Sequence, residues 1–291
     1  MTSNMATTPS DHKTPNAERR TPNASANRIT RCFRALRGKN KKAFIAYVCA
    51  GDPSLDATAD IVVAMAESGV DIVELGIPFT DPMADGQANQ DAASRALAAG
   101  ASVAGVLDCV RRIRARSQVP LLFFTYLNPI VAYGPERFAV DAVAAGADGI
   151  LLLDLPPDED PALLNLMRSA GLANICLAAP TTSAGRKRFL AKQSRGFLYY
   201  VCRLGVTGER AELPADLGEQ VAALKAAGKA PVCIGFGIST PEQAALAAAQ
   251  GDGVIVGSHL VKMIGQLGHD PELARLVAAR AGAMAAAVHA L

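Results

Sequence analysis

From residue 43 to its end, the chain repeats one pattern of hydrophobic and polar positions. A short run of consecutive apolar residues is followed by a glycine, proline or aspartate, and then by a longer stretch with apolar positions at helical spacing. Strands buried on both faces show such unbroken apolar runs, whereas half-exposed strands alternate apolar with polar residues. The pattern therefore predicts eight strand–helix units, with strands at residues 43–50, 71–77, 120–126, 149–155, 174–179, 197–203, 231–236 and 253–257.

The stretches between these runs are typical of amphipathic helices. Leu163, Leu166 and Met167, for example, share one helical face. A helix start is indicated at Thr240, which is followed by Pro241 at the first helical position and by Gln243 where a capping box needs it. Eight such units in about 250 residues favour a single closed (β/α)8 barrel. An open doubly wound sheet is less favoured, because no Gly-x-Gly-x-x-Gly follows the first strand.

The first 28 residues have a different composition. They are rich in Thr, Ser, Asn and Pro, and contain no apolar residue larger than Met. Such a segment cannot bury enough surface to offset its ordering entropy, so we expect residues 1–28 to be a disordered basic tail and residues 29–291 to form the catalytic barrel. Apolar residues then recur at helical spacing from Ile29 to Leu36, which predicts a short helix against the barrel.

The tail carries no secretory signal, because it lacks an apolar segment. An organelle transit peptide stays open as an alternative, since the tail is rich in hydroxyl residues and poor in acids. The six cysteines have no paired spacing and lie mostly in apolar runs, which favours a reducing, cytoplasmic location. No apolar run reaches the roughly 18 residues that a membrane span requires, so no membrane partner is expected.

Charge is distributed unevenly along the chain. Residues 1–42 contain ten Lys and Arg against Asp11 and Glu18, so the remaining 249 residues contain 19 bases against 25 acids. A folded domain with an acidic balance does not favour nucleic-acid binding. We therefore expect a small molecule, and no nucleic acid, as the ligand.

Three glycine-containing turns follow the last three predicted strands, at the end of the barrel where such folds carry their active sites. Glycines let backbone N–H groups approach an oxyanion closely, and the start of a helix adds a favourable dipole. These turns predict a phosphate site, although glycines that serve only the turns stay open as an alternative. The turns are residues 205–208, 235–237 and 257–258.

Carboxylates follow the earlier strands. Glu74 lies near the carboxyl end of an otherwise apolar strand, where a charge is costly to bury, so we expect a partner or a raised pKa. Asp81 and Asp85 lie in the next loop, and Asp154 ends the fourth strand. Each aspartate has a structural alternative, as a turn residue or a helix cap. The pattern indicates acid–base chemistry on a phosphorylated small molecule.

The histidines exclude two other kinds of site. None of the four ends an early strand, so neither a His-based nucleophilic triad nor a His-rich metal site is supported, and we expect no metal. They are His12, His259, His269 and His289.

One stretch is far more specific than the rest. Residues 74–86 read Glu-Leu-Gly-Ile-Pro-Phe-Thr-Asp-Pro-Met-Ala-Asp-Gly, which closely resembles the signature of the tryptophan synthase α subunit family. The resemblance runs from about residue 28 to the C-terminus. It includes the motifs at residues 50–53, 125–129, 179–182, 205–208, 235–238 and 256–258.

The resemblance implies a (β/α)8 lyase that cleaves indole-3-glycerol phosphate to indole and glyceraldehyde 3-phosphate. Indole would pass to a β subunit in an α2β2 complex for L-tryptophan synthesis, with pyridoxal phosphate on the β subunit and no cofactor in this chain. Glu74 and Asp85 match the catalytic residues, Thr207 the closing loop and Asp81 the partner-facing loop. The resemblance further implies phosphate binding by Gly208, Gly237, Gly257 and Ser258, and an indole pocket of Phe44, Leu122, Tyr126, Leu153 and Tyr199.

The chain departs from the family pattern at a few positions. Gln87 stands where proline is usual, in the loop expected to face the β subunit, and His259 stands where alanine is usual. Three alternatives therefore stay open: a stand-alone indole-3-glycerol-phosphate lyase, a non-catalytic activator of the β subunit, and another phosphate-binding barrel. Epimerases of the last kind usually need metal-binding histidines at the barrel mouth, which the sequence lacks.

Overall fold

Parallel strands form a barrel at the centre of the molecule. The computed structural model describes residues 1, 27–202, 213–235 and 237–291. All strand pairings are parallel, and the strand order β5-β4-β3-β2-β1-β9-β8-β7-β6 confirms the predicted barrel. The strands are β1 (Ala43–Cys49), β2 (Ile72–Gly76), β3 (Leu121–Thr125), β4 (Gly149–Leu152), β5 (Ala173–Asn174), β6 (Cys176–Ala178), β7 (Leu198–Val201), β8 (Val232–Gly235) and β9 (Gly253–Val256).

Each predicted apolar run contains a strand, and the fifth run contains β6 and the second residue of β5. Only Ile175 separates β5 from β6, so together they form the fifth barrel strand. The two halves pair in different directions: β5 with β4, and β6 with β7. Eight barrel positions are therefore filled, as the sequence pattern predicts.

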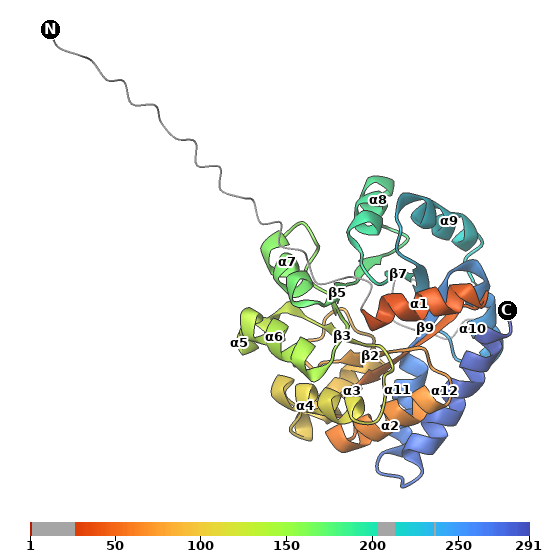
Figure 1. The fold of residues 1–291 in the computed structure, drawn as a ribbon. Helices are drawn as coiled ribbons and strands as arrows, with labels where there is room; N and C mark the ends of the chain where they lie inside the picture. Colours follow the sequence, from red (N-terminus) through yellow and green to blue (C-terminus); the bar gives the residue numbers. More distant parts are fainter. Residues whose placement is uncertain (2–26, 203–212, 236) are drawn as a thin grey trace.

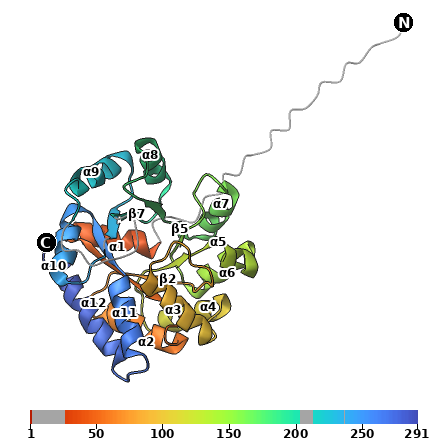
Figure 2. The same cartoon turned by 180° about the vertical axis from the view of Figure 1, so that it is seen from behind.

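Helices surround the barrel, as Figures 1 and 2 show from opposite sides. Thr240 forms the predicted capping box with Gln243 at the start of α10. The helices are α1 (Arg28–Gly38), α2 (Leu55–Glu67), α3 (Gln87–Ala98), α4 (Val103–Arg114), α5 (Leu127–Tyr133), α6 (Pro135–Ala145), α7 (Pro161–Ala170), α8 (Ala184–Gln193), α9 (Leu217–Ala227), α10 (Pro241–Gln250), α11 (Ser258–Leu267) and α12 (Leu273–His289).

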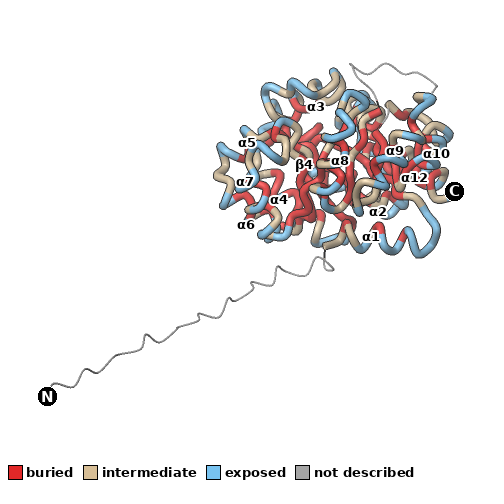
Figure 3. The backbone as a smooth tube through the Cα atoms, turned by 90° about the horizontal axis from the view of Figure 1, so that it is seen from above, coloured by how far each residue is buried: buried red, intermediate tan, exposed pale blue. Residues whose placement is uncertain are grey.

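Successive residues of each strand point to opposite sides of the barrel wall. In β1, Phe44 and Ala46 join the large cluster between strands and helices, whereas Ala43 and Ile45 join the cluster inside the barrel. Both sides are apolar, which explains the unbroken hydrophobic runs. Figure 3 shows the buried segments at the centre and the exposed ones on the outer helices.

Helix α1 covers the end of the barrel where the strands begin. Ile29 and Phe33 pack into the cluster inside the barrel, with Phe33 against the ring of Phe197 at 6.0 Å between centroids. This is the short helix that the sequence predicts. The disordered tail predicted for residues 1–28 falls largely outside the described residues, although two of its positions, Asn27 and Arg28, belong to the start of α1.

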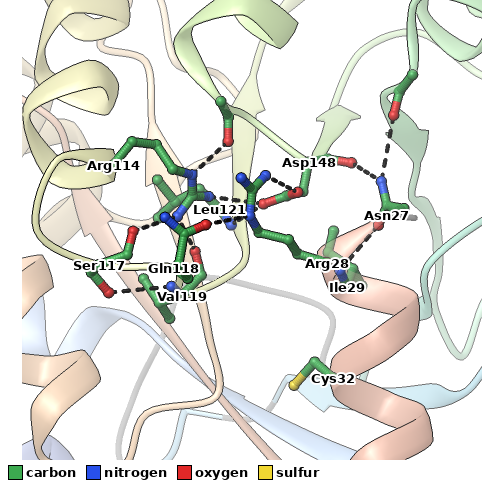
Figure 4. Close-up of polar contacts among 12 residues, drawn as sticks. Asn27, Arg28, Ile29, Cys32, Arg114, Ser117, Gln118, Val119, Leu121 and Asp148 are labelled. Atoms are coloured by element: carbon green, nitrogen blue, oxygen red, sulfur yellow. Dashed lines mark hydrogen bonds and ion pairs between the residues drawn. The ribbon is translucent and has the colours of Figure 1, made fainter. Parts of the chain in front are cut away.

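The start of α1 is anchored on Asp148, as Figure 4 shows. Asn27 caps α1 by accepting the N–H of Ile29, and its Nδ2 donates to the carbonyl of Asp148 at 2.7 Å. Arg28 and Arg114 each donate to one carboxylate oxygen of Asp148, at 3.0 and 2.9 Å. The Asp148 side chain is 3% exposed, so a charge that is almost fully buried is shared by two guanidinium groups.

Among the described residues, no single helix has the length and apolar composition of a membrane span. Only α3 and α4 taken together reach that threshold, and the chain bends by 96° between them.

Candidate active site

A cavity of about 500 Å³ opens at the carboxyl ends of the strands. It extends from the carboxylates after β2 to the glycine turns after β8 and β9, so it joins the two regions that the sequence assigns to acid–base chemistry and to phosphate. The described lining residues are Tyr47, Glu74, Met83, Ala84, Asp85, Gly86, Asn89, Phe124, Tyr199, Val201, Gly235, Gly237, Ile238, Ile255, Gly257 and Ser258.

Glu74 reaches this cavity from the middle of β2. Its side chain is fully buried, and neither carboxylate oxygen has a hydrogen-bond partner in the described structure. Burial without a partner disfavours the charged form and raises the pKa of Glu74 from 4.5 to about 8. Of the two outcomes expected from the sequence, the structure thus shows the raised pKa. Such a group can both give and take a proton near neutral pH.

Asp85 lies in the loop after β2 and is held by hydrogen bonds. Its two carboxylate oxygens accept from the Tyr126 hydroxyl at 2.9 Å and from Asn89 Nδ2 at 3.2 Å. The Tyr126 hydroxyl in turn accepts the N–H of Ala84 at 2.9 Å. Burial raises the pKa of Asp85, while the bonds from Asn89 and Tyr126 oppose that shift. These contacts fix the direction of the carboxylate; it does not cap the next helix, where Gly86 is the N-cap.

Two tyrosines form the walls of the cavity because glycines face them. A Cβ on Gly76 would lie 2.3 Å from the hydroxyl of Tyr47, and a Cβ on Gly235 would lie 2.6 Å from Cε1 of Tyr199. Tyr47 also packs edge-on against Phe124, at 5.1 Å between ring centroids. The glycines at the ends of β2 and β8 therefore make room for an aromatic pocket next to Glu74.

The other end of the cavity is built from backbone. Gly257 precedes α11, Ser258 begins it, and both line the cavity together with Gly237. Among the described residues, nothing lies within 4 Å of a Cβ placed on Gly237, so Gly237 is open toward the cavity on the described side. No Lys or Arg occurs among the described lining residues. A phosphate here would be held by N–H groups, a hydroxyl and the helix dipole.

Arg280 connects the two loops that carry this end of the cavity. Its Nε donates to His259 Nε2 at 3.0 Å, and its NH2 group donates to the carbonyl of Ser239 at 2.6 Å. His259 follows Ser258 on α11, and Ser239 follows the glycine turn after β8. Helix α12 thus holds both loops in position.

The structure brings most of the predicted site residues together. Glu74, Asp85 and Tyr199 line one cavity with Gly237, Gly257 and Ser258. Tyr126 contributes through its hydrogen bond to Asp85 rather than as a lining residue. Thr207 and Gly208 lie outside the described residues. Asp81 is exposed and accepts a hydrogen bond from the hydroxyl of Thr80 at 2.6 Å.

Three residues expected in the indole pocket are absent from the described lining of this cavity. Phe44 does not face the barrel interior; it packs between strands and helices. Leu122 does face inward, but in the apolar layer below the cavity that contacts α1. Leu153 packs against the cluster inside the barrel, as Tyr199 does, and also lines a second cavity near α7 and α8. Asp154 has a structural role other than fixing its own turn: its carboxylate accepts the N–H of Leu127 at the start of α5 at 2.8 Å.

Several lining residues were not expected from the sequence. Tyr47 and Phe124 take the places where Phe44 and Leu122 were predicted, and Asn89 and Met83 come from α3 and the loop before it. One signal could have identified Tyr47: if Glu74 points inward, its register neighbour in β1, which is Tyr47, does so as well. Among the described residues, no group of three or more His, Cys, Asp or Glu side chains could hold a metal ion.

Comparison with known proteins identifies the same fold and sequence pattern. The family model for the tryptophan synthase alpha chain matches residues 33–289. The chain is 51% identical over 236 residues to the tryptophan synthase alpha chain of Geobacter sulfurreducens, which covers 81% of this chain and 89% of that protein. It is 46% identical over 262 residues to that of Novosphingobium aromaticivorans, covering 90% and 97%.

Solved structures of tryptophan synthase alpha chains have a similar fold. The chain is similar to tryptophan synthase subunit alpha from Legionella pneumophila with a TM-score of 0.83 and 38% identity, covering 91% of this chain and 99% of that one. It is similar to the aminoacrylate-bound form of tryptophan synthase from M. tuberculosis with a TM-score of 0.80 and 34% identity, covering 90% and 100%.

Proposed function

The chain belongs to the tryptophan synthase alpha chain family, lyases of tryptophan biosynthesis, and from that premise we propose which of its residues cleave indole-3-glycerol phosphate. Glu74 is the proton-transfer residue, Asp85 stabilises the charged indole, and the turns after β8 and β9 bind the phosphate. The observation that carries the proposal is the fully buried Glu74 carboxyl with neither oxygen paired, on the wall of a cavity that also contains Asp85.

The reaction needs two proton transfers. Carbon 3 of the indole ring must gain a proton and the adjacent glycerol hydroxyl must lose one; the bond between that ring carbon and the glycerol carbon then breaks to give indole and the aldehyde. With its pKa near 8, Glu74 exists in both protonation states at neutral pH, so it can donate one proton and accept the other.

Asp85 has a different task. Protonation of the indole ring places positive charge on its nitrogen, and a carboxylate beside the ring N–H stabilises that charge. Tyr126 and Asn89 hold the carboxylate in a fixed direction before substrate binds. The aromatic walls formed by Tyr47, Phe124 and Tyr199 suit the flat, apolar indole ring.

Replacement of Glu74 tests the assignment. We expect Glu74→Gln to reduce indole release from indole-3-glycerol phosphate by a factor of at least about 100, because general acid–base catalysis typically contributes that much. Glu67→Gln, on the exposed surface of α2, is the control and should keep full activity. Unchanged turnover in a folded Glu74→Gln protein would remove Glu74 from the mechanism.

We also propose that the chain works in an α2β2 complex with a β subunit. In the family, pyridoxal phosphate belongs to that subunit. The loop between β2 and α3 supports a contact there, because Met83 lines the cavity and is 89% exposed, and Asp81 is exposed beside it. Gln87, at the start of α3, is also exposed and donates to Asp91 at 2.7 Å.

The dependence on a partner is measured by indole release with and without a β subunit. Slow release alone and much faster release with the partner is the result expected of the complex. Equally fast release without it indicates a stand-alone lyase instead. No release under either condition, with the β reaction nevertheless stimulated, indicates a non-catalytic activator.

We also propose that the protein is located in the cytoplasm. The described cysteines are all free thiols, five of them buried. Fusion of residues 1–28 to a reporter tests it. We expect the reporter to stay in the cytoplasm, and import into an organelle would show that the tail is a targeting segment.

A further inference from the structure

A second cavity, of about 190 Å³, lies in the barrel wall beside β4 and β6, between α7 and α8. A shallower hollow of about 310 Å³ adjoins it and shares Pro157, Leu164, Arg168 and Gln193. The neighbouring helices pack closely, α6 on α7 and α8 on α9, whereas α7 and α8 stand apart in Figures 1 and 2. No described residue lines both this cavity and the one that contains Glu74.

The walls of the second cavity are mainly apolar. They come from both faces of the barrel wall at β4 and at the fifth strand, where Ile175 and Leu153 also pack against the cluster inside the barrel, and from the inner faces of α7 and α8. A cavity lined in this way excludes bulk water from any polar group that reaches it. The apolar lining residues are Ile150, Leu152, Leu153, Leu155, Pro156, Pro157, Leu164, Ile175, Cys176, Leu177 and Leu190.

Two polar groups in the cavity are left without partners. Asn174 is 4% exposed; its Nδ2 donates to the carbonyl of Leu164 at 2.7 Å, but its Oδ1 accepts nothing in the described structure. Arg168 has a buried Nε that donates to nothing. Buried polar atoms are nearly always paired, so this donor and this acceptor give a molecule in the cavity two points of attachment.

The charge in the cavity is unbalanced. Arg186 is neutralised by both carboxylate oxygens of Asp158. Arg168 has no ion-pair partner among the described residues, and its one hydrogen bond, to Asn165, is 3.4 Å long. Burial lowers the pKa of Arg168, and the nearby Arg195 lowers it further. Arg195 itself donates to the backbone carbonyls of residues 192–194.

We propose that the cavity between α7 and α8 is a binding site for a small organic anion with an apolar body. The anionic group pairs with Arg168, a hydroxyl or amine of the ligand donates to Oδ1 of Asn174, and the apolar body fills the space between β4 and α8. The site shares no described lining residue with the catalytic cavity, so it does not depend on the roles assigned to Glu74 and Asp85.

The probe for this site is 4-hydroxybenzoate, which combines a carboxylate, a hydroxyl and a flat apolar ring. Titration into the full chain, followed by calorimetry and by backbone amide shifts, should show saturable binding with shifts in α7, α8 and β4–β6. Methyl 4-hydroxybenzoate lacks the charge and should bind at least tenfold more weakly. Inorganic phosphate lacks the apolar body and should also bind more weakly.

Variants assign the binding to Arg168. Arg168→Gln should weaken 4-hydroxybenzoate about ten- to hundredfold, the usual effect of losing one charged hydrogen-bond partner. Arg188→Gln removes the same charge from the exposed face of α8, does not line the cavity, and should bind like the unchanged chain. Glu74→Gln should bind normally as well, which separates this site from the catalytic one.

Three results would overturn the proposal: no saturable binding by the unchanged chain, equal affinity for the acid and its methyl ester, or unchanged affinity in Arg168→Gln. If Arg168→Gln does not fold, Arg168→Lys replaces it. That variant keeps the charge but loses the planar donor group, so we expect it to bind several times more weakly. Unchanged affinity in a folded Arg168→Lys protein would also count against the site.

Discussion

At the scale of the residue, Glu74 is the most unusual group in the described structure. It is a fully buried carboxyl with no partner, on a strand whose other residues are apolar or glycine. A polar group in such a position destabilises the folded state unless it remains neutral. Its presence is therefore explained by chemistry and not by stability, and the two can be separated experimentally.

Glu74→Gln should be more stable than the unchanged chain at neutral pH, although we expect it to lose most of its activity. Below about pH 4.5 Glu74 is neutral in both states; between pH 4.5 and 8 it ionises only when unfolded, so stability is lost as pH rises toward 8. The free energy of unfolding of Glu74→Gln should exceed that of the unchanged chain by an amount that grows with pH. This difference should reach about 3 kcal/mol at most at pH 7, and it should become constant above pH 8. Urea unfolding across pH measures it.

Glu67→Gln is the control for this pH dependence and should parallel the unchanged chain. A constant difference between Glu74→Gln and the unchanged chain from pH 4 to 9 would show that the Glu74 pKa is not raised.

At the scale of the element, the ends of β8 and β9 decide what the cavity can bind. Gly235 must be glycine because Tyr199 lies against it, whereas Gly237 is open toward the cavity. We expect Gly235→Ala to destabilise the fold by about 1–3 kcal/mol through overpacking. Gly237→Ala should leave the melting temperature unchanged but raise KM at least about tenfold, because its methyl group occupies phosphate space.

Steady-state kinetics and thermal unfolding of the two variants separate these effects. If Gly237→Ala binds substrate normally, the phosphate does not lie at the turn after β8.

The anchor of α1 on Asp148 is a second feature at this scale. Arg114 is largely buried, and burial lowers its pKa to about 10, so it relies on Asp148 for its charge. Asp148→Ala leaves that guanidinium with bonds to three backbone carbonyls but without its counter-charge, and should cost about 3–5 kcal/mol. Arg28→Ala removes only a partly exposed partner and should cost about 1 kcal/mol or less. Urea unfolding at pH 7 compares them, and equal losses would contradict this division.

At the scale of the whole molecule, the barrel is closed below by α1 and open above at the cavity. The boundary between tail and barrel then lies at Asn27, which caps α1 and contacts the carbonyls of Asp148 and Gly171. Deletion of residues 2–26 should change the melting temperature by no more than about 1 °C relative to the unchanged chain. Deletion of residues 2–28 should lower it by several degrees.

Thermal unfolding of the two shortened chains checks this boundary. A large loss on deletion of residues 2–26 would show that the tail is part of the fold.

Much of this protein can be predicted from its sequence, for reasons visible in particular residues. Strands buried on both faces are unbroken apolar runs, so their number and order predict the barrel. An isolated glutamate in such a run is too costly to be accidental, and glycines after the last strands are required for close backbone approach. Glu74, Gly237 and Gly257 were identified in this way, and the resemblance of residues 74–86 to one family supplied the reaction.

Which side of the barrel wall each residue faces was decided only by the tertiary structure. In a strand that is apolar on both faces the alternation leaves no trace in the sequence, so Phe44 and Leu122 were predicted in the pocket that Tyr47 and Phe124 actually line. The hydrogen bonds of Asp85, the divided fifth strand and the cavity beside Arg168 likewise depend on closure of the barrel. Local pattern determines the elements, but the contacts between elements distant in sequence exist only once the chain has folded.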